Sequence, residues 1–155
     1  MRHKREDVIE RENQEFELLD GLMAHLRDEE WRASLLRPET KDPWTVKDAL
    51  AHIAHWKSDV ARSIRKQRRP PEEQSLDTNA INHLSYLRWR DRSPVEVLEW
   101  HRQVHADVLD AMLHAPDEYF SGKERNEQWP FDLIGHSAYH RINDILRALK
   151  AHPKS

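Results

Sequence analysis

Apolar residues recur every three or four positions along much of this chain, and that spacing predicts amphipathic helices. The first predicted helix covers residues 5–27, and the second begins at Thr45, an N-cap candidate with Asp48 three residues further on. The second helix ends before residues 68–71, which are Arg-Arg-Pro-Pro. The apolar stripe of this helix consists of Val46, Leu50, Ile53, Val60 and Ile64.

The second half of the chain predicts further helices between proline-containing breaks. Residues 68–78 are polar and proline-rich and predict a loop, and residues 79–90 predict a short helix. Ser93 as a cap and Pro94 at the first helical position predict a helix that ends near His114. The last helix is expected after Trp129 and Pro130, and it continues to about residue 150.

These elements predict an all-α protein in which four long helices form an antiparallel four-helix bundle, with a long connection between the second and third helices. At 155 residues the chain is expected to be a single domain, residues 1–155. Charged residues make up 34% of the chain and only three residues are glycine, which is typical of amphipathic helices.

Charge and cysteine content narrow the classes of function. The formal charge of −3 gives no electrostatic reason to bind nucleic acid, and the short basic run at residues 65–69 is expected to be a solvated loop edge. Because the chain has no cysteine, disulfides, thiolate zinc sites and a cysteine nucleophile are excluded. The N-terminus is charged and no segment is long and apolar enough to span a membrane, so we expect a cytoplasmic protein without a membrane partner.

Three of the eleven histidines form the most informative pattern. His136 and His140 are four residues apart, so their side chains stack on one face of a helix. His52 lies on the shoulder of the apolar stripe of the second helix, beside Trp56, whereas His55 points nearly opposite, so His52 is preferred. Neutral imidazole is the commonest metal ligand, and two imidazoles from one helix with one from another would make an open site.

Two other readings of the histidines stay open on the sequence. A helical wheel gives the last helix an apolar centre made of Ile134, Ala138, Ile142, Ile145 and Leu149. It places His136 and His140 almost opposite, where a solvated pair on a polar face would also lie. Their segment lacks the glutamate of the zinc-protease motif, so that chemistry is not indicated.

His101 and His105 occupy the middle of the apolar stripe of the third helix. Buried polar groups must be hydrogen-bonded or ligate something, so this pair is expected in the core or supporting the site, with direct participation open.

The segment 44–56, WTVKDALAHIAHW, resembles the second helix of the DinB-like superfamily. Members begin that helix with a tryptophan and a small hydroxyl residue and place a histidine about two turns later. The segment 135–143, GHSAYHRIN, resembles the closing His-x3-His helix of the same superfamily. The two motifs occur in the expected order, and the predicted helices extend the similarity over most of the chain.

The resemblance implies a four-helix bundle and a divalent metal, nickel or zinc in most cases, held by the residues matching His52, His136 and His140. Characterised relatives include thiol-dependent S-transferases and a mycothiol-dependent maleylpyruvate isomerase, which adds a low-molecular-weight thiol as an implied cofactor. Proteins of the ClbS/DfsB type, which hydrolyse cyclopropanes, share the fold and the second-helix motif but commonly lack the metal triad. One departure is Asp144, where an aliphatic residue is common, with Ile145 one place later. The register of the last helix is therefore in question.

The preferred interpretation is a divalent-metal-dependent enzyme that transfers a thiol or water onto a small electrophilic substrate. A bound cation lowers the pKa of such a ligand and creates a nucleophile near neutral pH. Thiol transferase and hydrolase are not separated by the sequence, and no pattern marks an arginine for the carboxylates of a thiol cofactor, although Arg88, Arg141 and Arg147 are available. Bundles of this superfamily commonly pair through helix faces, so a homodimer is expected.

The alternative is a non-catalytic protein that binds a hydrophobic small molecule or a protein partner. The chain has six tryptophans, which are able to line an apolar pocket or simply to pack between helices. Trp56 and Trp129 are the candidates for a pocket wall.

Overall fold

The computed structural model describes residues 3–121 and 132–151, and about 74% of these residues lie in helices, with no strand among them. The prediction of an all-α protein is therefore confirmed. The elements in chain order are α1 (Arg5–Ala24), α2 (Asp28–Trp31), α3 (Val46–Ile64), the 3₁₀ turn η1 (Pro71–Glu73), α4 (Thr78–Trp89), α5 (Pro94–His114), α6 (Glu118–Ser121), α7 (Asp132–His140), the π-helical segment η2 (Arg141–Leu146) and α8 (Arg147–Ala151). None of the described helices is long and apolar enough to cross a membrane.

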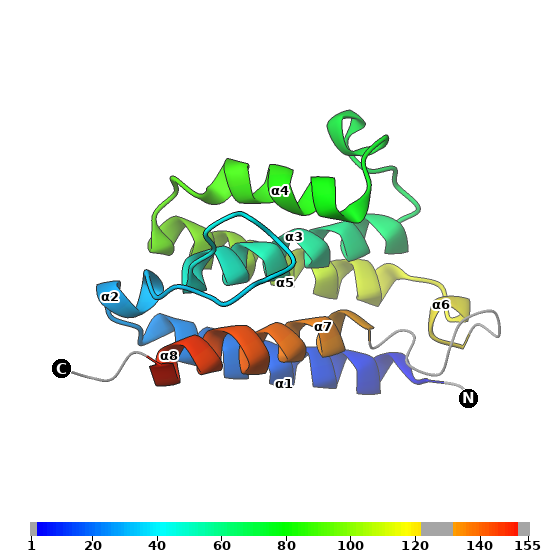
Figure 1. Ribbon diagram of the computed structural model, residues 1–155. Coiled ribbons are helices and arrows are strands. Elements are labelled where there is room, and N and C mark those ends of the chain that lie inside the picture. The colour runs from blue at the N-terminus through cyan, green and yellow to red at the C-terminus, as the bar shows by residue number, and fades with distance from the viewer. Residues whose placement is uncertain (1–2, 122–131, 152–155) are drawn as a thin grey trace.

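The long helices pack with their axes roughly side by side (Figure 1). Helix α3 is central, because it contacts α5, α4 and α7, while α1 packs against α5 and α7. Helix α4 lies outside α3 and follows the connection that contains η1 (Figure 1). The predicted short helix at residues 79–90 is thus α4, and part of the predicted loop is η1.

Local capping signals set the starts of the two helices that contribute most to the interior. The backbone N–H and the hydroxyl of Thr45 donate to the Asp48 carboxylate at 2.8 and 2.9 Å, and α3 begins at the next residue. Ser93 accepts the backbone N–H of Glu96 at 3.1 Å, and α5 begins at Pro94. Both starts lie where the sequence predicts them.

The core is divided into two apolar clusters that lie at opposite ends of the long helices. One cluster gathers the ends of α1 and α5 nearest α2 with the start of α3 and with η2 and α8, and it includes Leu19, Met23, Leu50, Ile53, Val97 and Ile145. The other gathers the opposite ends, and it includes Val8, Ala61, Ile64, Val108, Met112 and Leu133. Between them each long helix carries buried polar side chains, and we call this set, Glu12, Glu15, His52, Lys57, His101, Ser137 and His140, the polar band.

The last helix does not present the face that the helical wheel predicts. Ile142, expected at its apolar centre, is 51% exposed, whereas Ser137 and His140 are buried. The reason is the π-helical segment η2, which adds about one residue to a turn. The next buried position after His140 is therefore Ile145, five residues on, so the predicted stripe was wrong at Ile142 and correct at Ile145.

The connection after α3 covers a histidine that the wheel directed away from the core. His55 is buried, and its Nε2 lies 3.2 Å from a carboxylate oxygen of Glu73, which η1 contributes and which is also buried. The basic run at residues 65–69 is partly neutralised, because Arg65 pairs with Asp107 and Asp110 and Arg69 pairs with Asp59.

Candidate metal site

His52, His136 and His140 converge at the polar band. His52 comes from α3 and the other two from α7, and the three ring nitrogens that face one another all lie within 4.8 Å. The Nε2 atom of His140 is 3.2 Å from that of His52 and 3.2 Å from that of His136. The structure thus brings together the three side chains that the sequence selects.

The spacing of these nitrogens is suitable for one shared cation. Two ligand nitrogens bound to a zinc ion at about 2.0–2.1 Å, with angles between those of an octahedron and a tetrahedron, are about 2.8–3.4 Å apart. Both distances from His140 fall in that interval. Three neutral imidazoles also match the nitrogen ligands that zinc and nickel accept in proteins. The residues present therefore fit a divalent transition-metal ion.

Burial keeps two of these imidazoles in the neutral form that a metal requires. The pKa of His52 lies far below its usual value, chiefly because the ring is removed from water, with a further contribution from His140 and His136. Burial, together with His140, lowers the pKa of His136 to about 4. Near neutral pH both rings are uncharged, and each has a lone pair on one nitrogen.

Asp144 orients the third imidazole. The Nδ1 of His140 donates to the Asp144 carboxylate at 2.6 Å, which leaves Nε2 of the same ring without a proton and facing His52 and His136. A carboxylate behind a histidine is the usual device that fixes the ring orientation of a metal ligand. Asp144 stands where an aliphatic residue is common in the superfamily, and its contact with His140 gives this departure a role at the site.

Arg37 and Trp44 contact residues of the site from outside the triad, and with Asp144 they form a second layer around the three histidines. A guanidinium nitrogen of Arg37 lies 3.8 Å from the Asp144 carboxylate, and the guanidinium stacks over the Trp44 ring at 4.0 Å. The Trp44 ring centre is in turn 5.0 Å from that of His52. The loop before α3 thereby supports ligands from two different helices.

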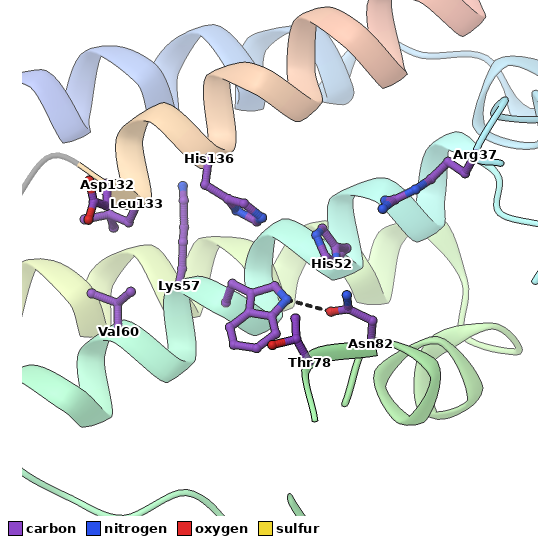
Figure 2. A pocket seen from close by; sticks show the side chains of 10 residues that line it. Arg37, His52, Lys57, Val60, Thr78, Asn82, Asp132, Leu133 and His136 are labelled. Atoms are coloured by element: carbon purple, nitrogen blue, oxygen red, sulfur yellow. Dashed lines mark hydrogen bonds between the residues drawn. The ribbon is translucent and has the colours of Figure 1, made fainter. Parts of the chain in front are cut away.

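A pocket of about 380 Å³ opens beside the histidines (Figure 2). His52 and His136 form one part of its wall, and the rest consists of Arg37, Trp56, Lys57, Val60, Thr78, Asn82, Asp132 and Leu133. The indole N–H of Trp56 donates to Asn82 at 2.8 Å, which fixes the ring against α4 (Figure 2). Trp56 was predicted as a wall residue and is one, whereas Trp129 lies outside the described residues.

The positively charged residues that line the pocket are not the arginines named in the sequence analysis. Arg141 is engaged with Glu15 at 2.9 Å, and Arg88 faces Glu72 on the surface. Arg37 and Lys57 line the pocket instead, and neither was a candidate. A signal for Lys57 did exist, because it continues the Leu50–Ile53 stripe with helical spacing.

His101 and His105 lie behind the site and not in it. Both are buried, and Phe16 stacks on them with ring centres 5.5 and 3.8 Å away. His101 Nε2 accepts a hydrogen bond from Lys57 at 3.1 Å, and His105 contacts Asn13 at 3.0 Å. The expectation that this pair is buried is confirmed, and neither residue is part of the triad.

A comparison with known families places this chain in a class of helical proteins. Residues 13–120 match the family described as Mycothiol maleylpyruvate isomerase N-terminal domain. The matched segment includes His52 and ends before His136. Because the match covers more than half of the chain, the protein belongs to this family, which is part of the DinB-like superfamily.

A solved structure agrees with the fold. An uncharacterised protein from Escherichia coli UTI89 superimposes with a TM-score of 0.64 at 12% sequence identity, over 96% of this chain and 88% of that chain. At this identity the similarity shows the fold alone. No curated protein matches the chain.

Proposed function

We propose that this protein is an enzyme that binds one divalent metal ion, zinc or nickel, through His52, His136 and His140 and transfers a thiol or water onto a small electrophile. The observation that carries the proposal is the convergence of three ring nitrogens, two of them from buried histidines, at the edge of a pocket. The family match supports a thiol as the transferred group. We further propose that α1, α3, α5 and the α7–α8 segment form the antiparallel bundle of DinB-like proteins as a single domain.

The pocket supplies what such a reaction needs from the protein. When bound, the ion lowers the pKa of a thiol or water and makes it nucleophilic near neutral pH. Trp56, Val60 and Leu133 form an apolar wall along which the electrophile would lie. Asp144 orients the His140 ring, and the proposed reaction requires no side-chain nucleophile.

The metal content of the purified protein tests the proposal. We expect about one zinc or nickel ion per chain by inductively coupled plasma mass spectrometry, as three protein ligands around one ion imply. Protein that contains no ion and takes up none after chelation and reloading would contradict the metal-dependent function. Ligand binding in the Trp56 pocket without metal, followed by indole fluorescence, would then favour the non-catalytic alternative.

Asp144→Asn is expected to weaken metal binding without abolishing it. Asparagine keeps the shape of the side chain but removes the charge that holds the Nδ1–H of His140. Loss of such a second-layer partner typically costs about 10- to 100-fold in metal affinity. Competition with a chromophoric chelator measures the change, and exposed Asp91→Asn is the matched control. An unchanged affinity would show that Asp144 does not orient a ligand.

The predicted homodimer remains a proposal that the surface supports. Leu18 on α1, and Tyr139 and Ile142 near the end of α7, are all more than half exposed, and α1 and α7 pack together. We expect light scattering at tens of micromolar to give about twice the 18.5 kDa chain mass. Ile142→Ser should shift the mass toward the monomer, while a monomeric wild-type protein would contradict the proposal.

A further inference from the structure

Lys57 brings a charged group into the interior next to the histidines. Its side chain extends from α3 toward α7 and lines the pocket together with His136 (Figure 2). The residue is only 1% exposed. Lysine is almost never buried to this extent unless its charge is paired. The pocket therefore has a buried ammonium group in its wall.

The charge partner of Lys57 is equally buried. Glu12 of α1 is fully buried, and one of its carboxylate oxygens lies 3.2 Å from the Lys57 nitrogen and 3.4 Å from Nδ1 of His105. Removing two charges from water is costly, and apolar residues of the same volume often stabilise a core as well or better. Packing alone thus gives no reason for this pair at the centre of the molecule.

The hydrogen-bond capacity of Lys57 is not exhausted by its protein partners. An ammonium group has three N–H donors. Nε2 of His101 accepts one at 3.1 Å, and the Glu12 carboxylate faces the ammonium group as its ion-pair partner at 3.2 Å. Burial and the nearby Lys57 charge hold the pKa of His101 well below its usual value, so this ring stays neutral and able to accept. Among the described residues no acceptor is found for the third N–H, and Lys57 borders the pocket.

The other charges of the pocket define where a negative group would lie. Arg37 is already paired, because its Nε donates to Glu39 at 2.6 Å and its guanidinium faces Asp144. Asp132 is exposed at the pocket wall near Leu133, and its carboxylate disfavours a second anion there. Nη1 of Arg37 also lacks a hydrogen-bond partner, and Lys57 is the more deeply buried of the two cations, with a side chain 1% exposed against 10% for Arg37.

We propose that Lys57 binds an anionic oxygen of the substrate, so that the pocket selects small carboxylic acids with an apolar body over the corresponding neutral compounds. The apolar body would lie along Trp56, Val60 and Leu133, which line the same pocket. Glu12 and His101 are positioning residues that hold the ammonium group in place. This inference rests on the proposed function, since it takes the electrophile to be the ligand of the pocket.

Binding of benzoate and of its neutral analogue benzamide tests the assignment by calorimetry, with the protein as purified and after treatment with EDTA. In both states we expect benzoate to bind wild-type protein about 10-fold or more tightly than benzamide, in line with a hydrogen bond to a charged group. The paired variant Glu12→Gln/Lys57→Met removes both charges together. It should lose about 10- to 100-fold in benzoate affinity while benzamide binding and metal content stay unchanged. Lys41→Met, the same change at an exposed lysine, should alter neither affinity.

Equal binding of the two compounds by wild-type protein would overturn the assignment, and so would an equal loss of both in the paired variant. Should the paired variant fail to fold, Arg37→Met decides, because it should keep the preference for benzoate, and loss of that preference would assign the anion to Arg37. The two proposals fail separately. Wild-type protein that takes up no metal but still prefers benzoate refutes the metal-dependent function, whereas protein that holds one ion and does not discriminate refutes the role of Lys57.

Discussion

His136→Ala is expected to remove stoichiometric metal from the purified protein and with it any thiol or water transfer. The ring nitrogen of His136 lies 3.2 Å from that of His140, in the triad that we propose as the ligand set. Loss of a direct ligand should exceed the effect of losing a second-layer partner, so we expect metal affinity to fall by more than about 100-fold. Metal analysis and chelator competition measure the loss.

A matched control separates a site effect from an effect on folding. His114→Ala removes an imidazole that is 77% exposed on the surface and should leave the metal content at the wild-type value. Far-ultraviolet circular dichroism should be the same for both variants. A His136→Ala protein that retains one ion with wild-type affinity would place the ion elsewhere and refute the triad.

Lys57→Met is expected to cause the largest loss of stability among single substitutions in the polar band. The change leaves the Glu12 carboxylate, which is fully buried, without its 3.2 Å charge partner. Breaking a buried ion pair on one side typically costs about 3–5 kcal/mol in the free energy of unfolding. Urea denaturation monitored by tryptophan fluorescence measures this cost.

The paired variant Glu12→Gln/Lys57→Met distinguishes a lost charge partner from lost packing. Because it removes both charges, it should recover a large part of the stability that the single substitution loses, which is the non-additivity expected of contacting residues. If the two substitutions destabilise the protein additively, the ion pair is not the source of the effect.

Much of the helical framework follows from local chemistry that a single sequence displays. The hydroxyl of Thr45 and the carboxylate of Asp48 interact within one turn, and Ser93 and Pro94 mark the start of α5 in the same way. The three histidines were found by spacing and by family resemblance, and the structure brings their nitrogens together. These features depend on neighbours within a few residues or on a shared motif.

Other features depend on contacts that spacing does not encode. A helical wheel assumes a constant 100° step, so it has no means of placing η2, and it assigned Ile142 to the core in place of Ser137. The Glu12–Lys57 pair joins residues 45 positions apart in two different helices. Both residues lie in the apolar stripes of their helices, at positions where an apolar residue is usual. A charged residue at such a position in each of two helices was the signal from which a buried ion pair could have been predicted.

The division of the core into two apolar clusters around the polar band bears on how such a protein acquires new substrates. Within the polar band a side chain such as Lys57 contributes both to stability and to the pocket, so most substitutions there would impair both. Helix α4 is different, because Thr78 and Asn82 line the pocket but belong to neither apolar cluster. Natural variation at these two positions would therefore reshape the pocket, in part through the Trp56 ring that Asn82 holds, at less cost to the interior than a change in the polar band. Divergence of specificity within the family should concentrate on this outer wall.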